Sequence, residues 1–196
     1  MPPIPDLNDD DRLFIGLMSG TSIDAIDCAL ISCRDNRVAL LATHSEPLPE
    51  ALRGRIASIS QPGANEIEQC GSLDRELGAA FARGALHLLK GANINASRVT
   101  AIGSHGQTIR HRPPSDNHRA GEPFTLQIGD AATLAELTGI DTVADFRSRD
   151  IASGGEGAPL APAFHRHAFG EPGTQRAIVN IGGIANVSLL AGDTLV

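Results

Sequence analysis

The stretch Phe14–Ile31, FIGLMSGTSIDAIDCALI, decides the fold, because two apolar runs flank a short turn of small and polar residues. The turn contains Ser19, Gly20, Thr21 and Ser22, and a glycine lets the backbone approach a neighbouring group closely. Backbone amides and hydroxyls gathered in such a turn are donors that face an anion. The stretch therefore predicts a β-hairpin that binds nucleotide phosphates, as in a phosphoryl-transfer enzyme.

An antiparallel meander of three strands is predicted around this turn, at residues 13–18, 25–32 and 37–45. Each strand is an apolar run, and the connections are short enough to be hairpin turns. The connection between the second and third strands contains Asp35 and Asn36, residue types that tolerate tight-turn geometry. The first part of the chain is therefore expected to form one side of a sheet.

Two helices are predicted next, a short one around residues 52–59 and a long one at residues 66–89. The long segment is amphipathic, with apolar residues recurring at helical spacing on one face. Because asparagine favours helix starts and glycine favours helix ends, we expect Asn65 to be its N-cap and Gly91 to end it.

Strands alternate with helices from residue 99 onward. The predicted strands are 99–103, 124–128 and 140–144, and the predicted helices are 130–138 and 159–169. This alternation indicates parallel pairing through right-handed crossovers. Ligands of such sheets bind beyond the carboxyl ends of the strands. Because Ser104–Gln107 and Asp145–Arg147 each follow a predicted strand, we expect them to converge on one cleft.

A second strand–turn–strand pattern closes the sequence, with a glycine turn at residues 181–186, IGGIAN. Gly182 and Gly183 are expected to face the same phosphates from a second lobe. The predicted organisation is a disordered tail at 1–12, a first lobe at 13–175 and the start of an incomplete second lobe at 176–196. The predicted fold class is α/β, with a mixed sheet covered by helices.

Composition argues against several functional classes. A net charge of −7 disfavours nucleic acid or an anionic membrane as the main partner, and no apolar run approaches the ~20 residues that cross a bilayer. The three cysteines show no Cys-x-x-Cys spacing, so they indicate neither a disulfide framework nor a zinc site. The acidic, proline-rich N-terminus is unlike a signal peptide. Together these features indicate a reduced, cytoplasmic compartment.

Five segments resemble the 1,6-anhydro-N-acetylmuramic acid kinase family, in the superfamily of sugar kinases, heat-shock chaperones and actin. They are GLMSGTSIDAIDCAL (16–30), AIGSHGQTIRH (101–111), LQIGDAATLAELTGIDTVADFRSRD (126–150), GGEGAPLAPAFH (154–165) and NIGGIANVSLL (180–190). The resemblance implies two ribonuclease-H-like lobes, each opening with a phosphate-binding hairpin. It covers the chain from Leu13 to Leu190 in order.

The resemblance also implies a reaction. Water attacks the anomeric carbon of 1,6-anhydro-N-acetylmuramic acid, and the released O6 takes the γ-phosphoryl group of ATP, with Mg²⁺ as metal cofactor. The product, N-acetylmuramic acid 6-phosphate, belongs to cell-wall recycling. The family places its general-base aspartate in a Gly-Phe-Asp-x-Gly-Pro-Gly-Asn segment, expected beyond Val196. We therefore assign no catalytic residue to this chain and expect these 196 residues alone to be inactive. The implied partners are a small amino sugar and, as the family allows, a second copy in a homodimer.

The resemblance assigns two sets of binding residues. The nucleotide set is Ser19, Gly20, Thr21, Ser22, Ile23, Asp24, Ala25, Ile26, Asp27, Gly182 and Gly183, with Asp24 also a metal ligand. The substrate set is His105, Gln107, Asp145, Arg147, Gly155 and Glu156. The guanidinium of Arg147 suits the lactyl carboxylate of muramic acid, although Asp145 and Arg147 equally suit an internal ion pair. The glycines around Gly155 are equally typical of a flexible loop. Gly20 is equally typical of an ordinary hairpin turn.

Two other functions stay open at this stage. One is a non-catalytic remnant that binds a nucleotide or a partner without turnover. The other is a different ATPase of the same superfamily. The segments SHGQTIRH (104–111) and DFRSRD (145–150) disfavour the second alternative, because an ATPase without a sugar site has no need of them.

Overall fold

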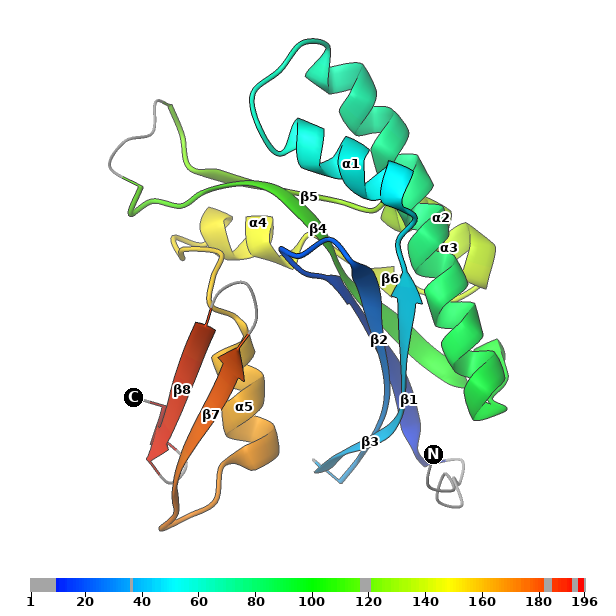
Figure 1. Cartoon of the computed structure of the whole chain (residues 1–196). Helices are drawn as coiled ribbons and strands as arrows, with labels where there is room; N and C mark the ends of the chain where they lie inside the picture. Colours follow the sequence, from blue (N-terminus) through cyan, green and yellow to red (C-terminus); the bar gives the residue numbers. More distant parts are fainter. Residues whose placement is uncertain (1–9, 36, 117–120, 182–184, 192–193, 196) are drawn as a thin grey trace.

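The computed structural model describes residues 10–35, 37–116, 121–181, 185–191 and 194–195 (Figure 1). A six-stranded mixed sheet forms the centre of the described chain, in the order β3-β2-β1-β4-β5, with β6 paired to β4. A smaller sheet has the order β7-β8-β9. The mixed α/β class predicted from the sequence is confirmed.

The first three strands are the predicted meander: β1 (Arg12–Ser19), β2 (Ala25–Arg34) and β3 (Arg37–Pro47). Adjacent strands pair antiparallel throughout. Successive side chains of a strand point to opposite faces, so Ile15 and Leu17 of β1 are buried while Gly16 and Met18 face outward. One face of the sheet is therefore committed to the core.

The central strand pairing joins the two halves of the sheet in parallel. β4 (Val99–Arg112) runs parallel to β1, and β6 (Thr142–Val143) runs parallel to β4. Three antiparallel strands followed by two strands parallel to the first are the ribonuclease-H-like arrangement that the resemblance implies. β5 (Phe124–Ile128), expected to pair in parallel, instead pairs antiparallel with β4.

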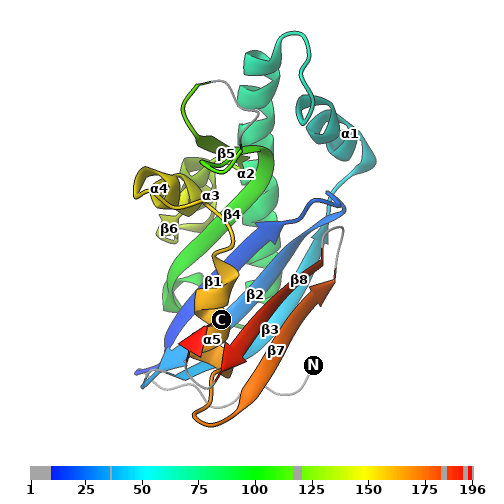
Figure 2. The ribbon, with the colours of Figure 1, turned by 90° about the vertical axis from the view of Figure 1, so that its left-hand side faces the viewer.

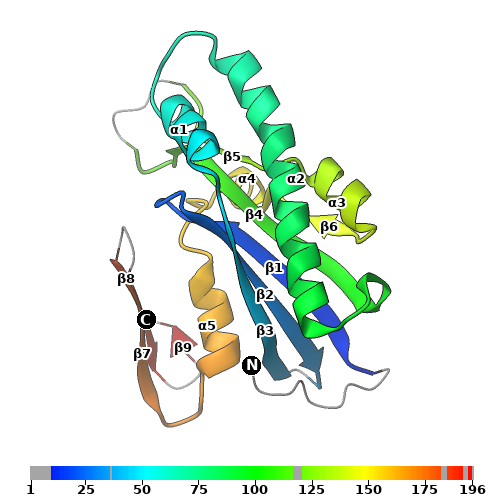
Figure 3. The ribbon, with the colours of Figure 1, turned by 45° about the vertical axis from the view of Figure 1, so that its right-hand side comes forward.

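Helices cover the core face of the sheet. Figures 1 and 3 show α2 (Glu66–Ala92) lying along it, with α1 (Glu50–Ile59) near one end and α3 (Ala131–Thr138) beside it. The fully buried side chains of the core include Phe81 of α2, and hydrophobic burial of this kind is the main stabilising term of the fold.

The ends of α2 differ from the prediction. Asn65 precedes the helix with a left-handed backbone but makes no side-chain capping bond. Gly91 does not end the helix, because the last turn continues to Ala92 and Asn93 adopts the left-handed conformation. The amide of Ile94 then donates to Leu89 O at 3.0 Å, satisfying a carbonyl of the final turn.

The later part of the chain differs from the prediction at its element bounds. β4 continues through the Ser104–Gln107 motif, which was expected to be a loop, and the expected strand at 140–144 is reduced to β6. α4 (Phe146–Ala152) was not predicted. α5 (Ala161–Phe169) begins two residues later than expected, after a cis Ala158–Pro159 peptide bond.

The small sheet consists of β7 (Gln175–Ile181), β8 (Ala185–Ala191) and β9 (Thr194–Leu195). Figures 1 to 3 place this sheet and α5 on the side of the six-stranded sheet away from α2. The ring of His165 on α5 makes a 2.9 Å hydrogen bond to Ser188 of β8. Gly182 and Gly183 lie outside the described residues, and the division into two lobes stays a prediction.

Asp130 caps α3, which gives a first stability prediction. Its carboxylate accepts hydrogen bonds from the amides of Ala132 (3.2 Å) and Thr133 (3.1 Å) and from the Thr133 hydroxyl. We expect Asp130→Ala to lower the free energy of unfolding by about 1 kcal/mol, measured by urea denaturation. Glu136→Ala removes the same charge from an exposed position of α3 and is the control. Equal urea midpoints for the two variants would contradict the capping role.

Candidate functional site

The turn between β1 and β2 presents its hydroxyls to solvent. Ile23 N donates to Gly20 O at 3.2 Å, and Thr21 and Ser22 are exposed. Ile23 has a φ of 55°, a region that is costly for a β-branched residue, while its half-buried side chain packs against the core. The core therefore holds the turn in a strained conformation, which is common where a backbone grips a ligand.

Two carboxylates follow the turn. The Ser22 hydroxyl donates to Asp24, and this bond is the main cause that holds the pKa of Asp24 below its ordinary value. Ser45 Oγ of β3 donates to Asp27 Oδ1 at 3.3 Å. Exposed carboxylate oxygens are the ligands that Mg²⁺ prefers, so the donor chemistry here fits that ion. Of the remaining predicted nucleotide residues, Ala25 is half-buried and Ile26 is buried in the core.

Ser19 and Gln107 join the turn to the centre of the sheet. Ser19 Oγ donates to Gln107 Oε1 at 2.6 Å, and the two residues are 1% and 2% exposed. Their backbones pair across β1 and β4, directly after a register shift. The side chains of both residues thus lie inside the fold, where they hold the end of β1 against β4.

A hollow of about 740 Å³ lies beside the turn, on the sheet face opposite the core. Its lining is mostly apolar and includes backbone and side chains from β1 to β4 and the ring of Phe146. Asp27 and His105 both line it. The structure therefore brings a predicted nucleotide residue and a predicted substrate residue to one concave surface, which is the usual form of a ligand site.

Arg147 and His105 are bonded to each other. Arg147 Nε donates to His105 Nε2 at 2.7 Å, and Arg147 Nη1 donates to Gly157 O at 2.8 Å. Because His105 Nε2 accepts, its proton is assigned to Nδ1, which donates to Gly106 O at 2.9 Å. Burial, helped by the Arg147 charge, lowers the pKa of His105, so the ring is neutral at pH 7.

Asp145 and Arg147 do not form the internal ion pair that the sequence left open. Among the residues that the structure describes, no ion pair joins them. Asp145 has a left-handed backbone, with φ at 57°, and stands at the start of α4 without capping it.

A second, smaller cavity of about 190 Å³ holds Asp145 and His105 together. Ser104 and Gln127 also line it, and Ser104 Oγ and Gln127 Oε1 are buried atoms without a hydrogen-bond partner among the described residues. Buried polar atoms normally have a partner, so two orphans in one cavity indicate a place for a hydroxyl-bearing ligand or for water.

The loop that contains Gly155 and Glu156 is folded onto its surroundings. Gly155 N donates to Asp150 O at 2.9 Å, and a Cβ on Gly155 would lie 2.3 Å from Asp150 Oδ2. Gly157 N donates to the same carboxylate at 2.7 Å. Glu156 Oε2 accepts from Ser115 Oγ at 2.6 Å. The glycines therefore serve close approach to α4, and the loop carries the Gly157 carbonyl that holds Arg147.

Three residues of this arrangement escaped the sequence reasoning: Gly157, Asp150 and Gln127. All three lie inside segments that carried the family resemblance, so the signal was present in the motifs. The motifs do not indicate which residues line the cavity and which hold a neighbouring residue in place.

Residues 12–196 match the sequence profile described as anhydro-N-acetylmuramic acid kinase. The chain belongs to the anhydro-N-acetylmuramic acid kinase family. A family member from Shewanella pealeana is 52% identical over 183 residues, covering 93% of this chain and 48% of the relative. One from Variovorax paradoxus is 50% identical over 179 residues, covering 91% and 47%. The chain thus spans about half the length of the curated relatives it matches.

The solved structures give a weaker likeness. One is a glucokinase of the ROK family from Streptomyces griseus, solved with glucose and AMPPNP. The match covers 93% of this chain and 46% of the glucokinase chain. The TM-score is 0.39 at 16% identity, and at that level we base no argument on it. Membership of the anhydro-N-acetylmuramic acid kinase family confirms the resemblance drawn from the five segments. No helix in the described ranges is long and apolar enough to cross a membrane.

Proposed function

We propose that the protein is an ATP-dependent anhydro-sugar kinase that opens the 1,6-anhydro ring of N-acetylmuramic acid and phosphorylates O6. The observation that carries the proposal is the hollow of about 740 Å³ that links Asp27, beside the turn, to His105, in a chain of this kinase family. ATP supplies the phosphoryl group, and Mg²⁺ neutralises phosphate charge. Positioning and charge neutralisation are the main demands of this chemistry.

The phosphate end of the site is assigned to the turn. The amides of Thr21 and Ser22 and the Thr21 hydroxyl bind phosphate oxygens, because both residues are exposed. The Ser22 hydroxyl already donates to Asp24. Asp24 and Asp27 hold Mg²⁺ through their carboxylates. Ser19 keeps the turn in register with β4 through its bond to Gln107.

The sugar end of the site is assigned to Arg147 and His105. Two nitrogens of the Arg147 guanidinium are held by His105 and Gly157, which orients the fork and leaves Nη2 for a substrate carboxylate. The neutral His105 ring acts as the acceptor that fixes this orientation. The lactyl carboxylate of muramic acid is the group that such a fork binds.

The smaller cavity is assigned to the polar substituents of the sugar. Asp145 and the unpartnered Ser104 Oγ bind a hydroxyl or amide there. Gly155 and Glu156 shape the edge by holding the loop that carries Gly157. Protein residues here bind and orient the substrate, and we assign the proton acceptor for the attacking water to none of the described residues.

Removal of a turn hydroxyl tests the phosphate assignment. We expect Thr21→Ala to raise the KM for ATP about tenfold, because a hydrogen bond to a charged phosphate is lost, with the KM for the sugar unchanged. The measurement is sugar-dependent ADP release by the protein expressed from its complete coding sequence, because the 196 residues alone are expected to be inactive. The product is identified as a 6-phosphate by ³¹P NMR. Ser58→Ala on α1 is the control, since that exposed hydroxyl bonds only Arg55 O. A rise in the sugar KM alone would contradict the assignment.

A further inference from the structure

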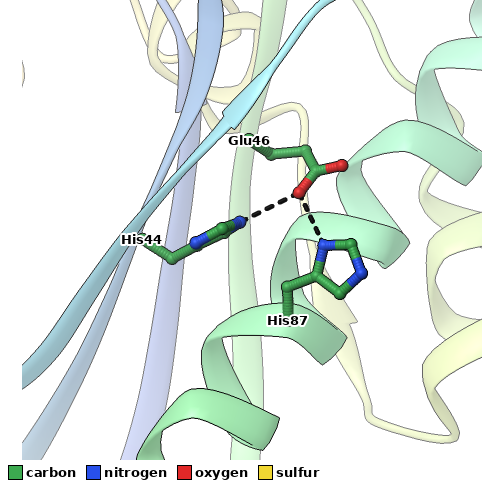
Figure 4. A group of neighbouring side chains, drawn as sticks. All are labelled: His44, Glu46 and His87. Carbon is green, nitrogen blue, oxygen red and sulfur yellow. Dashed lines mark hydrogen bonds and ion pairs between the residues drawn. The ribbon is translucent and has the colours of Figure 1, made fainter.

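Three metal-ligating side chains converge on the side of the sheet that faces α2. Figure 4 shows His44 and Glu46 from β3 meeting His87 from α2. Glu46 Oε2 lies 2.9 Å from His44 Nε2 and 2.7 Å from His87 Nδ1. One ligand atom from each residue lies within 4.8 Å of the other two. Of the three, His44 also lines the hollow of about 740 Å³ described above, whereas Glu46 and His87 do not.

The fold explains why the three side chains meet. His44 and Glu46 are two residues apart on β3, so their side chains share one face of the strand. Gly84 lets α2 approach that face, because a Cβ there would lie 3.2 Å from Glu46 Cβ and 2.9 Å from Cys28 Sγ. His87 follows Gly84 by three residues, about one helical turn, and therefore points toward the same strand.

Glu46 supplies the negative charge of the cluster. Burial raises the pKa of Glu46, but hydrogen bonds from both imidazoles and their charge outweigh burial, and the net pKa is lowered. Glu46 is therefore an ionised carboxylate. Burial, with the nearby Glu46 charge, raises the pKa of the neighbouring Cys28 thiol to about 12.

We propose that His44, Glu46 and His87 form a binding site for a transition-metal cation of the Zn²⁺ class. Two imidazole nitrogens and one carboxylate oxygen are a known ligand set for Zn²⁺, with the fourth position open to water. In a tetrahedral site the ligand atoms lie ~3.3 Å apart, which is close to the 2.9 and 2.7 Å between Glu46 Oε2 and the two histidine nitrogens. Imidazoles select Zn²⁺, Co²⁺ or Ni²⁺ over Mg²⁺, so the site does not take the cation used with ATP.

Binding fixes the tautomers of the two imidazoles. His44 Nε2 and His87 Nδ1 must offer lone pairs to the cation, so each ring carries its proton on the other nitrogen. The hydrogen bonds to Glu46 are then replaced by metal–ligand bonds. The cation ties the edge strand β3 to α2 at Glu46, which pairs with Ile26 two residues after Asp24. A bound cation therefore stabilises β3 and, through the Ile26–Glu46 pair, the start of β2.

Metal titration of the purified protein tests the proposal. Zn²⁺ alone, added to chelator-treated protein, is expected to bind at one equivalent in calorimetry and to raise the melting temperature by about 5 °C at 100 times Kd. Co²⁺ is expected to show the visible absorption bands of a four-coordinate site. Mg²⁺ at millimolar concentration should displace neither ion.

Variants show whether Zn²⁺ binds at these three residues or at other histidines of the chain. His87→Gln and Glu46→Gln are each expected to weaken Zn²⁺ binding at least about tenfold, since even outer-shell changes have effects of that size. His167→Gln, at an exposed position of α5, should leave the affinity unchanged. Circular dichroism of the metal-free variants checks their folding.

Each of three results would overturn the proposal. One is wild-type protein that binds no Zn²⁺ below millimolar concentration, which would leave the cluster as a hydrogen-bonded link between β3 and α2. Another is Zn²⁺ affinity that stays the same in His87→Gln. A third is displacement by Mg²⁺ at comparable concentration. The first and third need only wild-type protein, so they decide the matter even if a variant misfolds.

Discussion

Arg147→Ala is expected to raise the KM for the anhydro-sugar about 100-fold and to leave the KM for ATP within about twofold. The side chain is held by His105 and Gly157 at 2.7 and 2.8 Å, so its fork is oriented before substrate binds. Loss of charge-assisted hydrogen bonds to a carboxylate removes about 1.5–3 kcal/mol each, which sets the expected size. Arg147→Lys keeps the charge but lacks the planar guanidinium, so its KM for the anhydro-sugar should lie between those of the wild type and Arg147→Ala. Steady-state kinetics of the protein expressed from its complete coding sequence, with both substrates varied, provides the measurement.

Arg149→Ala is the matched control, because Arg149 is an exposed arginine on the same short helix. Its kinetic constants should equal those of the wild type. NMR titration of the His105 ring adds a second readout. Burial keeps the pKa of His105 low and the Arg147 charge lowers it further, so Arg147→Ala should shift that pKa upward. Equal increases in both KM values, or no change in the His105 pKa, would argue against the assignment.

Local pattern was sufficient for the regular parts of the fold. The apolar alternation in β1 and β2 and the helical spacing in α2 depend on neighbouring residues, which a sequence displays directly. The Ser104–Gln107 motif misled the prediction, because serine, glycine and histidine together are typical of a loop. In the structure, tertiary pairing with β1 holds this motif in strand β4, and Ser19 Oγ donates to the buried Gln107 Oε1.

Short elements were missed for a different reason. α4 has seven residues, none of them buried, so it carries no apolar periodicity that a sequence could reveal. The end of α2 was misplaced because glycine at residue 91 is a common stop, whereas Asn93 adopts the left-handed turn. Helix propensity alone does not decide either outcome.

The candidate site shows the same division. Family motifs named His105 and Arg147, but their mutual bond joins residues 42 positions apart and depends on where α4 begins relative to β4. The His44–Glu46 pair is visible in the sequence as an alternating strand pattern. His87 is 41 residues from Glu46, and only the close approach of α2 to β3 brings it into the cluster.

Gly106→Ala is expected to lower the free energy of unfolding by about 3 kcal/mol, the largest stability effect among these variants. Gly106 has a φ of 70°, which an alanine adopts at a cost. An added Cβ would lie 2.6 Å from Ile128 O, a backbone atom of the paired strand β5 that has no free rotation to relieve the contact. Urea denaturation followed by circular dichroism measures the change.

Gly103→Ala on the same strand is the matched control. Its added Cβ would meet only Ile15 O, at 3.9 Å, and its φ is not in the left-handed region. Its free energy of unfolding should therefore stay within about 1 kcal/mol of the wild type. Equal urea midpoints for Gly106→Ala and Gly103→Ala would contradict the prediction, because they would show that the added Cβ at residue 106 has no extra cost. Because Gly106 O accepts the Nδ1 proton of His105, a strand displaced by Gly106→Ala should also weaken sugar binding through the His105–Arg147 bond.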